Sequence, residues 1–250
     1  MLEHQVIFAS DAVQISEVRC HTEKSGCADL EQETSPRLVL PSAGAFAYHF
    51  SRRDEVVADP NTAVVLHAGM DFKISHPIEG GDVCTVFEFA DEAVLGAMRG
   101  AVPVNRCAAL AGRLARFARN RLAIEEHALA CAGALSAVAT RPVRSSIVER
   151  AKATIAGDPF GDWSLADVAR AVGTSPYHLT RSFKRVTGLS LHAYRLQLRL
   201  QAGLERAVGG EPLDRIAVDC GFAHHSHFTA TFREHFGTTP SVLRKISIAS

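Results

Sequence analysis

The sequence predicts an α+β protein in which an N-terminal β-barrel or sandwich with a helical segment is followed by an all-α region. Three observations support this fold class. Short runs of β-branched and aromatic residues alternate with turn residues as far as about residue 90. From residue 107 onward, apolar residues recur at helical spacing. Finally, residues 164–188 and 212–237 resemble each other, which indicates a repeated structural unit.

The charge distribution divides the chain in two. The 250 residues carry 27 Lys+Arg and 27 Asp+Glu, so the formal net charge is zero. Residues 1–140, however, hold 12 basic and 18 acidic residues, whereas residues 141–250 hold 15 basic and 9 acidic ones. We therefore expect two domains, 1–140 and 141–250, of which the basic one contacts a polyanion.

Several classes of protein are excluded by composition. The chain has no apolar run of about 18 residues without charge, so no transmembrane helix and no membrane partner are expected. The segment Met1–Asp11 lacks the basic residues of a signal peptide. Six cysteines occur without a CxxC pair, which favours reduced thiols. We expect a cytoplasmic protein without a cofactor.

The N-terminal strands are predicted from short runs of β-branched and aromatic residues that are separated by turn residues. Each run is short and is followed by Pro, Gly, Asp or Asn, and strands at such regular spacing favour a small barrel or sandwich. The predicted strands are Arg37–Leu40, Ala45–Phe50, Val56–Val57, Ala63–His67, Phe72–Ser75 and Asp82–Phe89.

Helices are predicted after the strands. Asp91–Met98 is predicted to form a short helix, and Cys107–Ala139 either one long helix or two with a break. Thr140–Pro142 is the best linker, because proline ends the preceding helix and can open the next one, Val143–Ala156.

The repeat predicts two helix-turn-helix units. Ser164 and Asp167 form the cap of the first unit, and Gly173 and Gly221 stand where the chain turns sharply and a positive φ is expected. The two copies are offset by 48 residues before the central glycine and by 49 after it, so the second turn is one residue longer. Between the units, Leu191–Val208 is expected to form a rigid connecting helix.

The second helix of each unit is the segment expected to enter the major groove of DNA. Its outward face follows by excluding the buried positions Leu179, Phe183, Phe228 and Phe232. The predicted DNA-contacting residues are Tyr177, Thr180, Arg181, Lys184 and Arg185 in the first unit, and His225, Ser226, Thr229 and Arg233 in the second. Arginine can contact guanine with two bonds, and the other cations suit phosphates.

Residues 145–245 resemble the AraC/XylS family of transcriptional regulators. The resemblance rests on the pattern Ala217 to Phe222, Ser226-His227-Phe228, Phe232-Arg233, Phe236-Gly237 and Thr239-Pro240. It implies sequence-specific binding to promoter half-sites in double-stranded DNA as a homodimer, with RNA polymerase as a further candidate partner. Ala230 departs from the polar or basic residue found in many members, which implies weaker base reading by the second unit.

The front half resembles the cupin-type sensor domain that often precedes this module, on its strand pattern and the segment Val64–Pro77. The metal-binding HxH…E…H signature of cupins is not evident. The resemblance implies a domain that binds a small-molecule effector or mediates dimerisation. Residues 107–139 are the candidate dimer contact.

Four residues are candidates for a sensor site. Cys20, Cys27, His76 and Cys84 carry ligands for a soft metal or thiols that can be oxidised. The spacing of Cys20 and Cys27 is not that of a standard zinc pair, so no metal is assigned. The alternative is that Cys84 is a core thiol and Cys20 an ordinary strand residue.

Other functions remain open at this stage. A cupin-type metalloenzyme with a DNA-binding appendage would need a triad such as His49, His67 and His76, although these lack the expected spacing. A fused DNA-repair methyltransferase would need a Pro-Cys-His motif, which the sequence lacks. An architectural DNA binder without a sensor is the last alternative. We expect a regulator without enzymatic activity.

Overall fold

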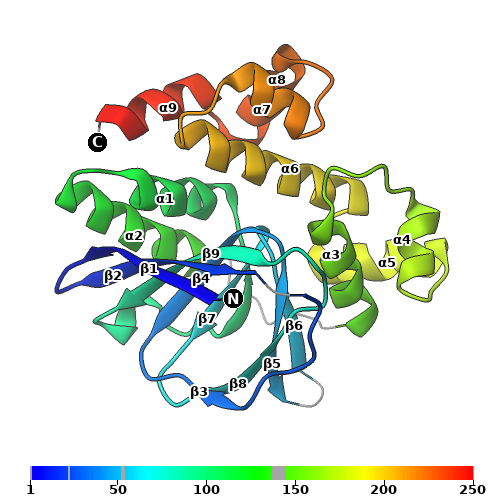
Figure 1. Ribbon diagram of the computed structural model, residues 1–250, viewed down its shortest axis with the longest axis horizontal. Coiled ribbons are helices and arrows are strands. Elements are labelled where there is room, and N and C mark those ends of the chain that lie inside the picture. Colours follow the sequence, from blue (N-terminus) through cyan, green and yellow to red (C-terminus); the bar gives the residue numbers. More distant parts are fainter. Residues whose placement is uncertain (1, 22, 52–53, 137–144, 250) are drawn as a thin grey trace.

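The computed structural model describes residues 2–21, 23–51, 54–136 and 145–249. It confirms the predicted α+β architecture, with two antiparallel β-sheets and a helical pair followed by helices only (Figure 1). Within this described part of the chain, no helix combines the length and the apolar character needed to cross a membrane. The segment Thr140–Pro142, predicted as a linker, lies outside the described residues.

Ten strands make up the two sheets. The six-stranded sheet has the order β1-β2-β9-β4-β7-β10 and the four-stranded sheet the order β3-β8-β5-β6, with antiparallel neighbours throughout. The strands are β1 Leu2–Ala9, β2 Val13–Cys20, β3 Glu31–Gln32, β4 Arg37–Ala43, β5 Phe46–Ser51, β6 Asp54–Ala58, β7 Thr62–Leu66, β8 Asp71–Ser75, β9 Asp82–Phe89 and β10 Gly100–Pro103.

All six predicted strands are present, and the sequence interpretation missed strands at both ends. β1 is an edge strand that is exposed at almost every position, so it lacks the alternation that signals a half-buried strand. The helix predicted at Asp91–Met98 is wrong in extent. Only a 3₁₀ turn, Glu92–Val94, forms there, and Gly100 then opens β10, which pairs with β7.

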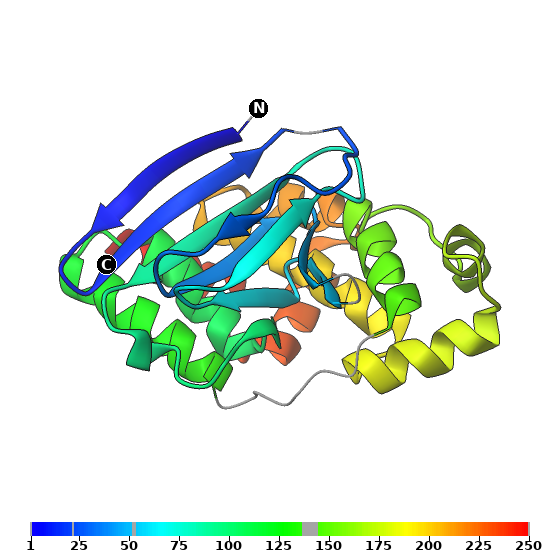
Figure 2. The ribbon, with the colours of Figure 1, turned by 90° about the horizontal axis from the view of Figure 1, so that it is seen from below.

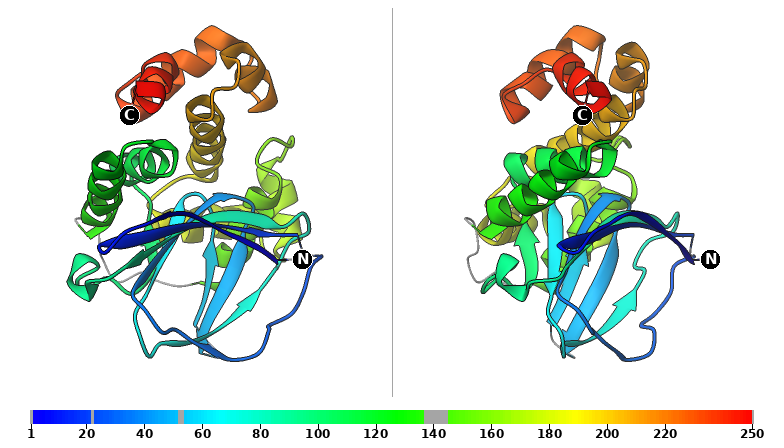
Figure 3. Two further views of the ribbon diagram at one scale, coloured as in Figure 1. Left: turned by 60° about the vertical axis from the view of Figure 1, so that its left-hand side comes forward. Right: turned by 90° about the vertical axis from the view of Figure 1, so that its left-hand side faces the viewer.

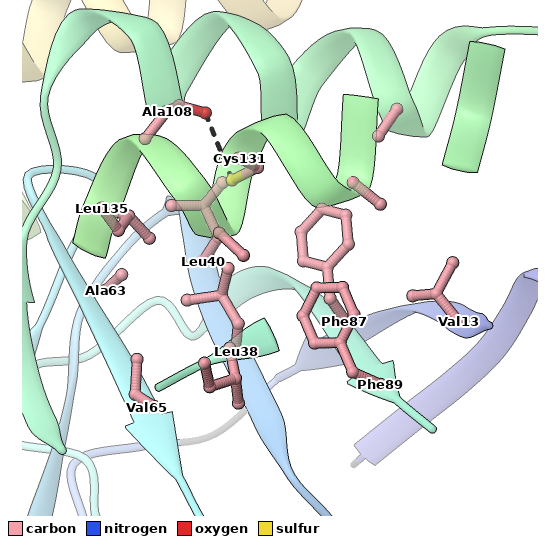
Figure 4. Packing of buried hydrophobic residues seen from close by; sticks show 14 of the residues in the cluster. Val13, Leu38, Leu40, Ala63, Val65, Phe87, Phe89, Ala108, Cys131 and Leu135 are labelled. Atoms are coloured by element: carbon pink, nitrogen blue, oxygen red, sulfur yellow. Dashed lines mark hydrogen bonds between the residues drawn. The ribbon is translucent and has the colours of Figure 1, made fainter. Parts of the chain in front are cut away.

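One face of the six-stranded sheet is covered by two helices, α1 (Arg106–Phe117) and α2 (Arg121–Ser136). Of the two alternatives predicted for segment 107–139, the structure has two helices with a break between them. Leu38, Leu40, Phe87 and Phe89 point from the sheet toward these helices (Figure 4). Gly112 permits the close approach, because a Cβ there would lie 2.4 Å from the Leu40 Cδ2. Each fully buried Leu or Phe of this layer contributes about 1.5–3 kcal/mol.

The opposite face of the same sheet looks toward the four-stranded sheet. The space between them is a cavity of about 750 Å³, lined mainly by apolar side chains such as Val39, Tyr48, Phe72 and Ile74. The N-terminal region (residues 2–136) is thus a two-sheet shell with its own interior space, as the predicted barrel or sandwich requires.

The C-terminal region (residues 145–249) contains helices only. Their bounds are α3 Ser146–Gly157, α4 Leu165–Ala171, α5 Pro176–Thr187, α6 Leu191–Val208, α7 Leu213–Asp219, α8 His225–Phe236 and α9 Pro240–Ala249. The long α6 connects the group α3–α5 to the group α7–α9 (Figures 2 and 3).

The two regions share hydrophobic clusters. Ala45 of the β4–β5 turn and Ala47 and Val57 of the four-stranded sheet pack in one cluster with residues of α3, α4, α5 and α6. Ala109 of α1 packs in another with residues of α6, α7 and α8. Helix α6 contacts α1 on one side and α7 and α9 on others, as Figure 1 shows. Because apolar surface is buried across the boundary, the two regions are docked against each other.

Candidate nucleic-acid interface

The first helix-turn-helix unit consists of α4 and α5. The Ser164 side chain accepts a 3.1 Å bond from the Asp167 N–H, and the Asp167 carboxylate accepts a 3.2 Å bond from the Ser164 N–H. This confirms the predicted capping box, which fixes where α4 begins. Gly173 turns the chain at a φ of +69°, as expected for a residue without a Cβ.

The second unit, α7 and α8, repeats this geometry with a longer turn. Gly221 has a φ of +74°, close to that of Gly173. The segment between the helices runs from Val172 to Ser175 in the first unit and from Cys220 to His224 in the second, so the predicted insertion of one residue is confirmed. The His224 ring takes the capping role, because its Nδ1 accepts a bond from the His227 N–H at 3.1 Å.

Helix α5 presents a basic face to solvent. It begins at Pro176 after the cap Ser175, and it buries Leu179 and Phe183 against α3, α4 and α6. The five positions predicted to contact DNA are all exposed: Tyr177, Thr180, Arg181, Lys184 and Arg185. Three of them are cations, so this face attracts a polyanion.

Two of these side chains are held in place by their neighbours. The Arg181 Nη1 donates a 3.0 Å bond to the Tyr177 Oη, and the guanidinium lies 5.5 Å from the centre of the Tyr177 ring. The Thr180 hydroxyl donates to the Pro176 carbonyl at 2.9 Å. Tyr177 therefore holds the Arg181 guanidinium in one orientation on the exposed face of α5.

Helix α8 offers a weaker face. Ser226 and Arg233 are exposed, whereas His225 and Thr229 are half-buried and lie against each other, 3.4 Å from Nε2 to Oγ1. Among the four predicted contacts of this helix, Arg233 is the only permanent cation, and the exposed Glu234 stands beside it. Two of the four predicted contacts on α8 are thus exposed, whereas all five on α5 are.

The connecting helix α6 has the predicted bounds, Leu191–Val208. Its arginines have a role that the sequence interpretation missed. The Arg199 guanidinium donates to the carbonyls of Pro159 at 2.8 Å, Phe160 at 3.2 Å and Gly221 at 3.3 Å. It thereby ties the loop before α4 to the turn of the second unit and fixes the two units relative to each other.

Comparison with known proteins identifies the domain type of the C-terminal region. Residues 168–246 match the helix-turn-helix domain family. Rob from Salmonella typhimurium, a transcriptional regulator, is 35% identical over 85 residues, which cover 34% of this chain and 29% of Rob. The match covers the second predicted unit completely and the first unit from residue 168 onward.

The C-terminal region is an AraC-type helix-turn-helix domain.

Two further relatives match part of this chain. AdaA from Bacillus subtilis, a bifunctional transcriptional activator and DNA repair enzyme, is 33% identical over 85 residues, which cover 34% of this chain and 39% of AdaA. The virulence regulon activator VirF from Yersinia enterocolitica is 30% identical over 135 residues, which cover 52% of this chain and 50% of VirF. The chain thus spans half or less of these curated relatives.

Among solved structures, ToxT from Vibrio cholerae aligns over 94% of this chain and 98% of ToxT, with 14% identity and a TM-score of 0.41.

The AraC-type domain is docked on the N-terminal region through buried polar contacts of α6. The Tyr194 hydroxyl donates a 2.5 Å bond to the Asp59 carboxylate in the β6–β7 turn, and the Asn61 amide donates to the Tyr194 carbonyl at 3.0 Å. Burial raises the pKa of both Asp59 and Tyr194 above their ordinary values. This network lies inside the boundary between the regions.

Two further contacts cross the same boundary. In α3, Glu149 accepts from the Val57 N–H at 2.8 Å and Lys152 donates to the Val57 carbonyl at 2.7 Å, so this ion pair extends the hydrogen-bonding pattern of β6. On the other side, Glu205 of α6 forms ion pairs with Arg113, at 2.6 Å, and with Arg116 of α1. Charged contacts that are buried in this way fix one geometry of docking.

The predicted sensor residues are only partly brought together. Cys20, His76 and Cys84 line the cavity between the sheets, whereas Cys27 is exposed and is not among the lining residues. Asp82, which the sequence interpretation missed, joins Cys20 and His76. Cys84 is buried, and burial raises the pKa of its thiol well above the ordinary value, as expected for a core thiol.

The histidines required for a cupin-type metal triad serve other purposes. His67 is buried and contacts the Glu92 carboxylate at 2.5 Å through Nδ1 and the Met98 carbonyl at 2.7 Å through Nε2. His49 lies 2.7 Å from the Ser75 hydroxyl. In the described segments, neither residue belongs to a group that could hold a metal ion.

Proposed function

We propose that this chain is a sequence-specific DNA-binding transcriptional regulator. The observation that carries the proposal is the exposed basic face of α5, which an AraC-type domain presents with Arg181 already oriented by Tyr177. The names of Rob and VirF, a transcriptional regulator and a transcriptional activator, support it.

The proposed mode of binding places α5 in the major groove. Arg181 contacts a guanine edge and Thr180 an adjacent base or phosphate, while Lys184 and Arg185 contact phosphates. In the second unit, Ser226 and Arg233 reach the DNA, and His225 and Thr229 contribute after a side-chain rearrangement. Because α8 carries fewer cations, the first unit supplies most of the affinity.

The proposed regulator acts through its N-terminal region. Residues 1–140 form a sensor and dimerisation domain in this proposal, and residues 141–250 the DNA-binding domain. A small effector with apolar surface occupies the 750 Å³ cavity between the sheets. Its binding changes DNA affinity through the docking contacts of α6, which join both regions.

A homodimer contact is proposed on α2. Leu122 and Leu129 lie two turns apart on one face of this helix and are 63% and 44% exposed. Apolar residues repeated in this way are typical of a helix that packs against a second copy. RNA polymerase remains a candidate partner of the DNA-bound form.

The alternative of a metalloenzyme has less support. His67 commits both ring nitrogens to neighbours, so a triad of His49, His67 and His76 would require rebuilding of the core. AdaA is a bifunctional activator and repair enzyme by name, but its match covers only 34% of this chain. We therefore propose a regulator without catalytic activity, located in the cytoplasm.

The decisive experiment is a salt titration of binding to the promoter DNA upstream of the gene. Arg181→Ala is expected to lose about 1–3 kcal/mol of discrimination against randomised DNA, whereas Lys184→Ala weakens binding to all DNA and lowers the salt slope by about 1. Arg121→Ala is the matched control, because Arg121 is an exposed arginine of the N-terminal region. Equal binding by all four proteins to specific and randomised DNA would refute the proposal.

The effector cavity has a separate test. Binding of the fluorophore anilinonaphthalene sulfonate to the folded wild-type protein is expected to be lost in the cavity-filling variant Ile74→Trp. Val242→Trp, at an exposed position of α9, is the control. Undiminished binding to a folded Ile74→Trp variant would exclude the cavity as the site.

A further inference from the structure

Three potential metal ligands converge at one end of the cavity between the sheets. One ligand atom from each of Cys20, His76 and Asp82 lies within 4.8 Å of the other two, and the His76 Nε2 is 3.3 Å from the Asp82 Oδ2. The three residues come from the end of β2, the segment after β8 and the start of β9. No other group of this kind occurs in the segments that the structure describes.

Backbone pairing holds these residues in place. Cys20 and Asp82 are directly opposite each other in the antiparallel pair β2–β9. His76 exchanges two backbone bonds with Ser25, at 3.2 and 3.0 Å. Gly81 lies so close to the Cys20 carbonyl that a Cβ there would be 1.9 Å from its oxygen. The ligand positions are therefore set by the sheet and not by flexible loops.

One carboxylate oxygen of Asp82, Oδ2, faces the His76 Nε2 at 3.3 Å but is not hydrogen-bonded. The residue is only 6% exposed, and its Oδ2 receives no hydrogen bond. The other oxygen, Oδ1, lies 4.0 Å from the Cys84 sulfur. A buried carboxylate oxygen without a donor is costly, and a bound cation removes that cost.

The His76 ring is oriented as in known metal sites. Its Nδ1 lies 3.3 Å from the Ser25 hydroxyl, which leaves Nε2 directed at Asp82. A second partner of this kind fixes the ring of a ligating histidine and typically changes metal affinity about 10- to 100-fold.

We propose that Cys20, His76 and Asp82 bind a Zn²⁺ ion whose fourth coordination position opens into the cavity between the sheets. A thiolate, an imidazole and a carboxylate are the three ligand types that Zn²⁺ takes in proteins. Ligand atoms around tetrahedral Zn²⁺ are roughly 3.3–3.8 Å apart, so no pair of ligand atoms needs to approach by more than about 1.5 Å. On binding, the Cys20 thiol releases its proton to solvent and the sulfur donates an electron pair to the metal.

The fourth position would hold water or an anionic group of a molecule in the cavity, because Cys20, His76 and Asp82 all line that cavity. The site is independent of the helix-turn-helix units. Its failure would leave the proposed DNA binding intact, and loss of DNA binding would leave the metal site intact.

The test uses the full chain after removal of metals by a chelator. Wild type is expected to bind one equivalent of Zn²⁺, and with Co²⁺ to show tetrahedral visible bands and a thiolate charge-transfer band. Cys20→Ser, His76→Ala and Asp82→Asn should each weaken binding by at least about 10-fold, and Cys20→Ser should also lose the charge-transfer band. Cys27→Ser, which removes an exposed cysteine, should change nothing.

A second readout needs no variant. Zn²⁺ should protect Cys20 of the wild-type protein from alkylation by iodoacetamide, measured by mass spectrometry, while Cys27 stays reactive. The proposal is overturned if wild type binds no stoichiometric Zn²⁺, in which case His76 and Asp82 form an ion pair only. It is equally overturned if Zn²⁺ binds without protecting Cys20, or if folded Cys20→Ser binds as tightly as wild type.

Discussion

The hydroxyl of Tyr194 and the carboxylate of Asp59 are joined by a 2.5 Å hydrogen bond, although the residues are 135 positions apart in the sequence. Both are buried, with exposed fractions of 3% and 0%. The bond links the connecting helix of the DNA-binding units to a turn of the sheet that encloses the cavity. It is one of the contacts through which the proposed effector would act on α6.

Tyr194→Phe tests the strength of this link. The variant keeps the aromatic contact with Phe183, whose ring centre is 5.2 Å away, and removes only the hydroxyl. Because the Asp59 Oδ2 loses its donor while Oδ1 keeps the bond from the Asn61 N–H, we expect the free energy of unfolding to fall by about 1–3 kcal/mol in urea titrations. Tyr177→Phe, at an exposed tyrosine, should stay within about 0.5 kcal/mol of wild type. Equal losses in both variants would show that the buried bond contributes nothing.

The pH dependence of stability should report Asp59. Burial raises the pKa of this carboxyl, and Lys152 and the bond from Tyr194 oppose the shift only in part. The folded protein then holds the proton more tightly than the unfolded chain, whose pKa is roughly 3.9. As pH rises from that value through the raised pKa, the contribution of Asp59 to the free energy of unfolding therefore decreases, and above it the loss is complete.

Asp59→Asn removes this titration. The difference in the free energy of unfolding between Asp59→Asn and wild type should shift in favour of the variant as pH rises through that window, and then level off. Urea titrations at several pH values measure it. A difference that does not vary with pH would contradict the assignment of the raised pKa to Asp59.

The Tyr177 ring should matter for DNA recognition through Arg181. Tyr177→Ala removes both the hydrogen bond and the aromatic face under the guanidinium, whereas Tyr177→Phe removes only the bond. We expect Tyr177→Ala to weaken specific DNA binding more than Tyr177→Phe does, with a difference of about 0.5–1 kcal/mol. Competition between promoter DNA and randomised DNA measures the effect. If the two variants behave alike, the ring does not orient Arg181.

The α2 contact predicts the oligomeric state. The double variant Leu122→Glu, Leu129→Glu places charge on the proposed dimer face, so analytical ultracentrifugation should show monomer where wild type is dimer. Leu30→Glu is the matched control, since Leu30 and Leu122 are each 63% exposed. A monomeric wild type, or a dimer that survives the double substitution, would show that α2 does not form the proposed dimer contact.

The local features of the fold were predictable from the sequence, because short-range interactions decide them. The capping box of Ser164 and Asp167, the left-handed glycines Gly173 and Gly221 and the bounds of α6 all depend on residues a few positions apart. The helix expected at Asp91–Met98 stops after one 3₁₀ turn, because Gly96 takes a left-handed φ of +56°. The strand Gly100–Pro103 that follows was missed because its pairing with β7 is a contact between distant segments.

The sequence by itself determined the paired helix-turn-helix units and the basic face of α5. The spacing of apolar residues, the capping residues and the charges of each helix all depend on residues that are close together in the chain. Only the tertiary structure decided how the regions dock and which residues meet in the cavity. Asp82 comes beside Cys20 through strand pairing, and Asp59 beside Tyr194 through helix packing. Such contacts depend on the register of strands and on the burial of apolar surface between distant segments, neither of which leaves a local pattern in the chain.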